Sequence, residues 1–211
     1  VETIQSGNVP QLRALRLHNG TIYRWNRMCY GITDNKPHMR IECRYIPAGP
    51  SIQDEIANAA FWVGLMKARP ENVKKIWEHF DFKDVKSNFF KAARSGVESV
   101  FVWRGKTISA HDLIKNELLP LAHEGLKNRG FSNEEIYVYL GTIEKRLSSS
   151  TGSQWQVRNF KKQKKEMNVS DALNALTEFM HDQQKQNTAV CAWPDIQIPA
   201  ALKKQVANMR I

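Results

Sequence analysis

The sequence has 211 residues, of which 42% are hydrophobic and 25% are charged, with 11 glycines and 8 prolines. This length suffices for one domain or two small ones, and the composition excludes collagen-like, low-complexity and wholly disordered chains. Thirty-one Lys and Arg residues against 21 Asp and Glu residues leave a formal charge of +10. Such an excess favours anionic partners such as nucleotides, nucleic acid or acidic metabolites, although solubility alone is an equal explanation.

The cysteines and the apolar stretches indicate the cellular compartment in which the protein works. Cys29, Cys43 and Cys191 lack C-x-x-C spacing, which fits neither a disulfide framework nor a zinc site. The apolar stretch at residues 57–66 is far shorter than the ~20 residues of a membrane-spanning helix, and no basic-then-apolar leader opens the chain. We therefore expect a cytoplasmic protein without a membrane segment. Because the chain begins at Val1 rather than at methionine, we also expect it to be part of a longer polypeptide.

The first part of the chain has the pattern of strands. Apolar and polar residues alternate in short runs over residues 11–46. Asn19-Gly20 is a favoured two-residue hairpin turn because both turn positions must accept positive φ, and residues 34–37 carry a second turn signal. We expect a hairpin at Asn19-Gly20 and a second strand over residues 39–46.

The rest of the chain has the pattern of helices. Ser51 is a suitable cap for a helix over residues 52–67, which Pro70 would end. A small hairpin is expected near residues 99–109, and Ser109 and Ser132 are further expected caps. Helical spacing of apolar residues recurs in 71–80, 85–94, 110–128, 133–147 and 170–184.

These patterns predict an α+β fold that is mainly α. Residues 1–69 would form one domain of strands and a helix, and residues 70–211 a helical subdomain that ends in an extended tail. The tail, with Trp193-Pro194 and residues 196–199, is expected to dock on the body or on another subunit. The basic run at residues 161–165 is expected to be a solvated helix face, because no aromatic residues that could stack on bases are interleaved with it.

One segment carries a pattern with chemical meaning. In Arg40-Ile41-Glu42-Cys43-Arg44, strand alternation puts Arg40, Glu42 and Arg44 on one face and the other two residues on the opposite face. An ordinary solvent-facing sheet surface can have this pattern. The functional alternative is an open site in which the carboxylate holds a divalent cation and the guanidiniums bind phosphate or carboxylate in bidentate fashion.

The segment and its surroundings resemble a known superfamily. The R-x-E-x-R strand is followed by a proline-containing turn at residues 45–50 and by a helix with Asn58-Ala59, an order that resembles the glutamine synthetase and glutamate-cysteine ligase superfamily. Residues 17–27 and 38–44 are more closely similar to bacterial glutamate-cysteine ligase-like proteins of the carboxylate-amine ligase group. Residues 151–156 resemble the C-terminal helical region of that group. The similarity covers roughly residues 12–158.

The resemblance implies a site for ATP and Mg²⁺. It makes Glu42 a magnesium ligand, and it places Arg40 on the ATP phosphates. Arg44 would bind the transferring phosphoryl group or the glutamate carboxylate, and Arg24 and Arg27 would be further anion contacts. The strands would then be the closing part of a glutamine synthetase-like catalytic sheet.

The resemblance also implies a reaction. ATP would phosphorylate the side-chain carboxylate of glutamate, and an amine, cysteine in glutathione biosynthesis, would attack the acyl phosphate to form a γ-glutamyl amide. Members of the family hold their metals with further carboxylates from earlier strands, so this chain alone is expected to be inactive and to need the remainder of its catalytic domain. A homo-oligomer is compatible with this reading. The alternatives are a regulatory or assembly module that keeps the ligase fold without activity, and a basic nucleic-acid-binding helical protein.

Overall fold

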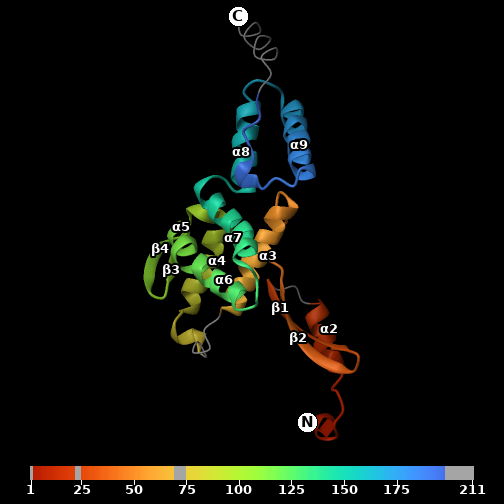
Figure 1. Cartoon of the computed structure of the whole chain (residues 1–211). Coiled ribbons are helices and arrows are strands. Elements are labelled where there is room, and N and C mark those ends of the chain that lie inside the picture. The colour runs from red at the N-terminus through yellow and green to blue at the C-terminus, as the bar shows by residue number, and fades with distance from the viewer. Residues whose placement is uncertain (1, 22–24, 69–74, 198–211) are drawn as a thin grey trace, which may run out of the picture. The chain divides into compact units, whose positions relative to one another are not determined.

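The structure is a computed structural model that describes residues 2–21, 25–68 and 75–197 (Figure 1). The chain divides into two compact units, Val1–Ala48 and Gly49–Ile211. The described residues are mostly helical and contain two antiparallel sheets of two strands each. This confirms the α+β, mainly α class.

The strands are β1 (Asn26–Thr33), β2 (Lys36–Cys43), β3 (Val100–Trp103) and β4 (Lys106–Ser109). The α-helices of the described ranges are α1 (Glu2–Gln5), α2 (Arg13–Thr21), α3 (Ile52–Lys67), α4 (Phe82–Ser95), α5 (Ala110–Leu113), α6 (Leu119–Lys127), α7 (Asn133–Ser148), α8 (Gly152–Gln163) and α9 (Val169–Lys185). Short 3₁₀ turns lie at η1 (Ile76–Glu78), η2 (Gly96–Glu98) and η4 (Val190–Ala192), and a π-helical turn at η3 (Ile114–Leu118). Among the described residues of the helix expected over 71–80, only η1 is helical.

The first unit consists of α2 and the β1–β2 hairpin, preceded by the single turn of α1. The hairpin turn lies at Asp34-Asn35, whose φ angles of 50° and 56° match the left-handed pair of a type I′ turn. The expected hairpin at Asn19-Gly20 is wrong, because that dipeptide lies in the last turn of α2. There the Asn19 amide donates a hydrogen bond to the carbonyl of Met28 in β1, over 2.9 Å, and so ties α2 to the sheet instead of forming a turn. The second strand was expected over 39–46 and begins and ends three residues earlier.

The helix α3 begins where its cap predicts. The Ser51 hydroxyl accepts a hydrogen bond from the backbone N–H of Asp54 at 3.2 Å, and the helix ends at Lys67, as expected. It packs against α6 and α7. The compact units therefore divide after Ala48, whereas the sequence pattern predicts a division after residue 69.

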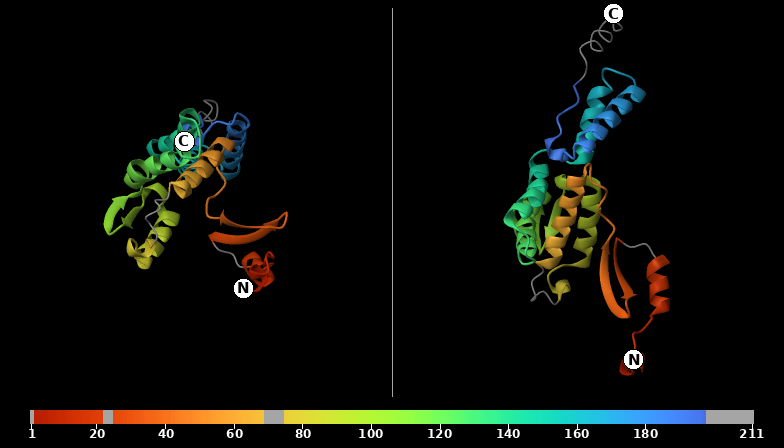
Figure 2. Two further views of the ribbon diagram at one scale, coloured as in Figure 1. Left: turned by 60° about the horizontal axis from the view of Figure 1, so that its bottom comes forward. Right: turned by 45° about the vertical axis from the view of Figure 1, so that its right-hand side comes forward.

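The main core of the second unit lies between α3, α6 and α7. Its buried residues are aliphatic: Ala57, Leu119, Ala122, Leu126, Ile136, Leu140 and Ile143. The backbones of α3 and α6 approach closely, since a Cβ atom on Gly125 would lie 2.0 Å from the carbonyl oxygen of Gly64. Figure 2 shows these helices beside one another in two further views.

The expected small hairpin near 99–109 is confirmed by β3 and β4. Its turn is Arg104-Gly105, with φ angles of 49° and 75°. On the other edge of β3 the amide of Asn88 in α4 donates to the carbonyl of Val102 at 2.7 Å and accepts from its N–H at 3.0 Å. A side chain thus replaces the backbone pairing that a third strand would supply.

A second core joins α8, α9 and the segment that follows them. Trp155 is fully buried, stacks on Phe179 with ring centroids 5.4 Å apart, and meets Trp193 edge-on at 5.0 Å. The indole N–H of Trp155 donates to the carbonyl of Pro194 at 3.1 Å. The described part of the tail therefore docks on α8, within the body of the chain; residues 198 and 199 lie outside the described residues.

In the described part of the chain, no helix combines the length and the apolar character that crossing a membrane requires.

Candidate anion site on the first unit

The pairing of β1 with β2 decides which side chains share a face. Arg27 lies opposite Glu42, and Cys29 lies opposite Arg40. Side chains of directly opposed residues point to the same face of a sheet. Arg40 and Glu42 therefore share one face, as strand alternation predicts, and Arg27 joins them from the neighbouring strand.

The Glu42 carboxylate lies between two guanidinium groups. Arg27 donates to its Oε2 atom from Nε at 2.8 Å and also from Nη2, and the Nε atom of Arg44 lies 3.4 Å from its Oε1 atom. The hydrogen bond from Arg27 is the largest influence that lowers the pKa of Glu42, and the charges of Arg27 and Arg44 act in the same direction against the opposing effect of burial. The same hydrogen bond raises the pKa of Arg27. Glu42 is therefore ionised at neutral pH and paired on both oxygens.

Arg27 also fixes α2. Its Nη1 atom donates to the carbonyl of Asn19 at 2.6 Å, so one guanidinium joins the end of the helix to the carboxylate on β2. The positive charge of Arg27 is stabilised there, because a helix C-terminus carries partial negative charge. The Tyr30 hydroxyl, which donates to the carbonyl of Pro10 at 2.7 Å, holds the segment before the helix. Helix and hairpin are thus connected at both ends of α2.

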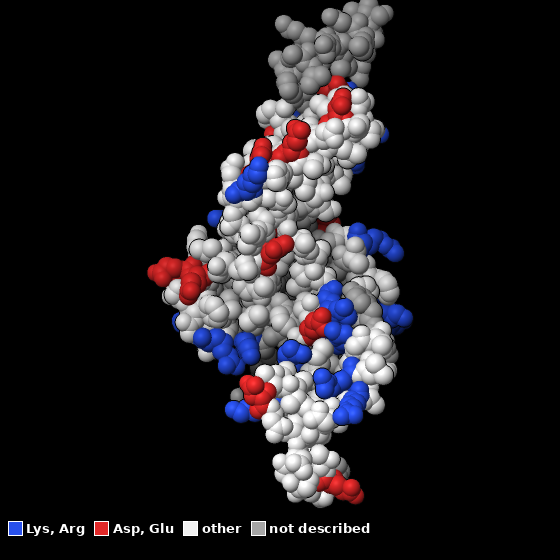
Figure 3. Space-filling view, turned by 90° about the vertical axis from the view of Figure 1, so that its right-hand side faces the viewer, with Lys and Arg blue, Asp and Glu red and all other residues white. Residues whose placement is uncertain are grey.

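A hollow of about 320 Å³ lies between α2 and the hairpin. Three arginines line it, namely Arg16 of α2, Arg27 of β1 and Arg40 of β2, and no Asp or Glu of the described residues does. Its charge follows from that of the unit, because residues 1–48 contain seven Lys or Arg and three Asp or Glu, a net +4 of the total +10. Figure 3 shows Lys and Arg side chains gathered over the lower part of the face in view, with fewer acidic side chains between them. A hollow with this lining suits an anionic ligand.

A glycine shapes one wall of the hollow. A Cβ atom at Gly31 would lie 2.5 Å from Cε1 of His38, which is directly opposite on β2. Because Gly31 has no Cβ atom, the imidazole of His38 can lie over β1 at this position. Its Nε2 atom is 3.2 Å from the hydroxyl of Thr33. Gly31 therefore allows His38 to line the hollow beside the arginines.

The residues expected in the site are only partly brought together. Arg27 and Arg40 line the hollow, whereas Arg44 contacts Glu42 without lining it. Arg24 lies outside the described residues. Sequence reasoning missed Arg16, because the segment that carries it was interpreted as a strand; the run Arg13-Ala-Leu-Arg-Leu, made of good helix formers, was the available signal.

The described residues do not fit a magnesium site at Glu42. Both of its oxygens already bond to guanidiniums, and in the parts of the chain that are described no group of three or more His, Cys, Asp or Glu side chains is placed to hold a metal. Mg²⁺ requires about six oxygen ligands in octahedral geometry. In this chain Glu42 acts as an arginine partner.

Comparisons of the chain with protein-family models, with curated proteins and with solved structures gave no significant match.

Proposed function

We propose that the first unit binds an oxyanion, a phosphate or a carboxylate, in the hollow between α2 and the β1–β2 hairpin. We further propose that it does so as part of an ATP-dependent carboxylate-amine ligase of the glutamate-cysteine ligase type. The observation that carries the proposal is the set of three guanidiniums, from Arg16, Arg27 and Arg40, around a hollow that no carboxylate of the described chain lines.

The three arginines have different roles in the proposal. Arg27 is held by Glu42 and by the carbonyl of Asn19, so it supplies fixed positive charge at the base of the site. The guanidiniums of Arg16 and Arg40 make neither a hydrogen bond nor an ion pair to another described residue, so they are available to a ligand. A guanidinium binds phosphate or carboxylate through two parallel N–H bonds, which is stronger than a contact with a single ammonium.

The ligase reading rests on the R-x-E-x-R resemblance together with this charge. In such a reaction the γ-phosphoryl group of ATP passes to the side-chain carboxylate of glutamate, and the amine then attacks the acyl carbon and releases phosphate. Negative charge is spread over the phosphoryl oxygens throughout, so arginines that bind these oxygens would stabilise the transition state. Arg40 and Arg16 are the residues of this chain that we assign to that role.

Oxyanion binding is tested by titrating the whole chain with pyrophosphate, ATP and glutamate in a calorimeter. Arg16→Ala and Arg40→Ala should each weaken binding roughly tenfold to a hundredfold, the effect of losing one hydrogen bond to a charged group. Arg13→Ala is the matched control, because Arg13 lies on the same helix but does not line the hollow. Equal affinities in all three variants would overturn the site.

The ligase reading needs a separate test. In the complete polypeptide, release of phosphate from ATP that requires both glutamate and cysteine supports it. If no such release occurs while the chain still binds pyrophosphate, the oxyanion site stands and the regulatory or assembly alternative is favoured. Binding to single-stranded nucleic acid that weakens steeply with added salt would favour the nucleic-acid alternative instead.

A further inference from the structure

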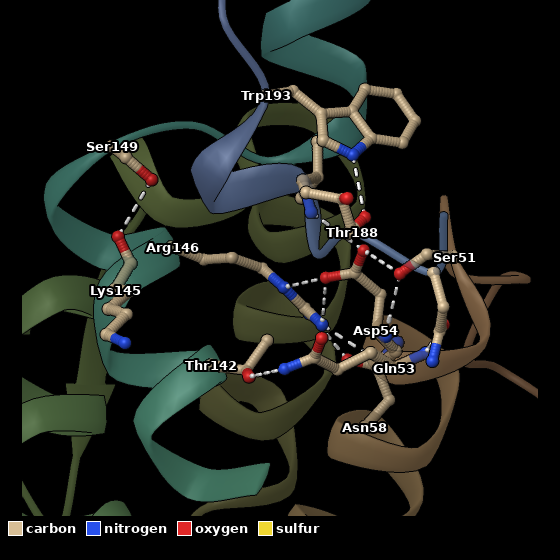
Figure 4. A network of polar contacts seen from close by, with 12 residues as sticks. Ser51, Gln53, Asp54, Asn58, Thr142, Lys145, Arg146, Ser149, Thr188 and Trp193 are labelled. Atoms are coloured by element: carbon tan, nitrogen blue, oxygen red, sulfur yellow. Dashed lines mark hydrogen bonds and ion pairs between the residues drawn. The ribbon is translucent and has the colours of Figure 1, made fainter. Parts of the chain in front are cut away.

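The second unit contains a larger hollow, which the proposed function does not use. It has a volume of about 560 Å³ and lies where the first turn of α3, the end of α7 and residues 186–192 meet. Its lining consists of side-chain amides, hydroxyls, one thiol, one ammonium and the methyl groups of Ala189 and Ala192, and among the described residues no carboxylate lines it. We call this the Lys145 pocket, after the residue that carries its charge. Figure 4 shows Gln53, Thr142, Lys145, Ser149 and Thr188 of its wall.

The walls of the Lys145 pocket are joined behind it by a buried ion pair (Figure 4). The Asp54 carboxylate is fully buried and lies 2.8 Å from the Nη2 atom of Arg146 in α7. It also accepts hydrogen bonds from the hydroxyl of Ser51 at 2.8 Å and from the backbone N–H of Val190 at 2.9 Å. Three separate parts of the chain are thus bound to one carboxylate. The pocket is therefore formed before any ligand arrives, which reduces the entropy that binding would cost.

A second contact fixes the rim. The backbone N–H of Gln53 donates to the Oδ1 atom of Asn187 at 2.9 Å, and Asn187 has a φ of 51°, in the left-handed region. A residue other than glycine in this region costs free energy, and it stays there only where its surroundings hold it. The contact to α3 supplies such a constraint, and it leaves the Nδ2 group of Asn187 without a hydrogen bond to another described residue.

The hydrogen-bonding groups that remain define the ligand. The amide nitrogen of Gln53 donates to Thr142 at 3.3 Å, so its carbonyl oxygen is left as an acceptor. The Nδ2 group of Asn187, the hydroxyl of Thr188 and the ammonium of Lys145 have no side-chain partner among the described residues. The pocket therefore offers one positive charge together with neutral donors and acceptors.

We propose that the Lys145 pocket binds a small polyhydroxylated carboxylate of the sugar-acid class. One ammonium matches one carboxylate, while amide and hydroxyl groups match the hydroxyls of such a molecule. A phosphate dianion is a poorer match, because no guanidinium fork lines the pocket. An amino acid is a poorer match as well, because no described carboxylate lines the pocket to pair with its ammonium.

The test is a titration of the ¹⁵N-labelled whole chain with gluconate, followed by NMR, with glucose and inorganic phosphate as comparison ligands. We expect gluconate to shift the amide signals of Gln53, Lys145 and Asn187 in a saturable way. Glucose lacks the carboxylate and should bind at least tenfold more weakly. Shifts that are equal for all three ligands, or absent with gluconate, would overturn the proposal.

Three variants assign the effect to the pocket. Lys145→Met should weaken gluconate binding at least tenfold, whereas Lys164→Met, at an exposed position after α8, should not change it. Asn187→Gly removes the amide but suits the positive φ, so it should weaken binding without unfolding the chain. Wild-type affinity in both Lys145→Met and Asn187→Gly would contradict the proposal.

Discussion

Glu42 and Arg27 face each other across the β1–β2 hairpin, and two hydrogen bonds join the guanidinium of Arg27 to a single carboxylate oxygen. Arg44 adds a third cationic contact to the same carboxylate. The pair connects β2 to β1 and, through the carbonyl of Asn19, to the end of α2. The hairpin and the helix that enclose the oxyanion hollow are thus held together by an ion pair between partly exposed side chains, and such a pair is sensitive to pH.

The first prediction concerns the acid stability of the first unit. The folded-state pKa of Glu42 lies below its ordinary value of 4.5, chiefly because Arg27 donates to its carboxylate. A carboxyl group whose pKa is lower in the folded state stabilises the fold above its unfolded pKa, and this stabilisation is lost as the pH falls through the folded value. The protection of the β1 and β2 amides, taken relative to the intrinsic exchange rate at each pH, should therefore fall below about pH 4.5.

The Glu42→Gln variant provides the control for this prediction. Its β1 and β2 amides should be less protected than those of wild type at pH 7, because the ion pair is gone, and their protection should fall little further as the pH passes through this range. An acid profile that matches that of wild type would contradict the role of Glu42. In the wild-type chain Mg²⁺ should leave the NMR signals of β2 unchanged, because both oxygens of Glu42 already contact guanidiniums.

Much of the fold could be predicted because its signals are local. Ser109 accepts from the N–H of Asp112 at 3.0 Å and Ser132 from that of Glu135 at 3.2 Å, so both expected caps are confirmed. The basic run was expected to be a solvated helix face: all four of its lysines are exposed, but only Lys161 and Lys162 lie in α8, which ends at Gln163. A cap, a turn or a helix face depends on residues within a few positions of one another, which a sequence displays directly.

The parts that could not be predicted depend on distant partners. Alternation placed Arg40 and Glu42 on one face, but it contains no information on register, so the pairing of Arg27 with Glu42 was not foreseen. The turn assigned to Asn19-Gly20 failed for the same reason, since the Asn19 amide is used by a strand nine residues further on. The contact of Asp54 with Arg146 spans 92 residues and has no signature in either segment.

The second prediction concerns that buried pair. Asp54→Ala leaves the Arg146 guanidinium, which is only 13% exposed, without its carboxylate, and it removes the acceptor of the Val190 N–H. Removing one partner of a buried ion pair costs about 3–5 kcal/mol. Urea unfolding of the variant, followed by circular dichroism, should show a loss of this size. The control Asp84→Ala, at a position on α4 outside the network, should lie within about 0.5 kcal/mol of wild type. A loss below about 1 kcal/mol in Asp54→Ala would mean that the pair does not hold the three segments together.

The third prediction concerns the contact between α3 and α6. A methyl group at Gly125 would lie 2.0 Å from the carbonyl oxygen of Gly64 and 2.7 Å from the backbone nitrogen of Ala68, so two backbones must separate to admit it. Gly125→Ala should therefore destabilise the second unit by about 1–3 kcal/mol, although alanine is the better helix former.

Gly141→Ala is the matched control for this contact. Gly141 lies within α7, and nothing comes within 4 Å of the methyl group it would gain. Helix propensity then acts alone, and the variant should be more stable by roughly 0.5–1 kcal/mol. Thermal unfolding of the two variants should thus move in opposite directions from wild type, and a shift in the same direction would contradict the close approach of α3 and α6.

The fourth prediction concerns the docking of the tail on α8. Asn159 is fully buried; its Oδ1 atom accepts from the N–H of Ile196 at 2.8 Å, and its Nδ2 group donates to the carbonyl of Trp155 at 2.9 Å. Asn159→Ala leaves a buried N–H without an acceptor, which costs about 1–3 kcal/mol. Exchange of the Ile196 amide hydrogen should accelerate accordingly, by roughly tenfold to a hundredfold if the segment opens locally. Lys161→Ala, at an exposed position on the same helix, should leave this exchange rate unchanged. Unchanged protection of Ile196 in Asn159→Ala would show that the aromatic contacts of Trp155 and Trp193 hold the tail without this hydrogen bond.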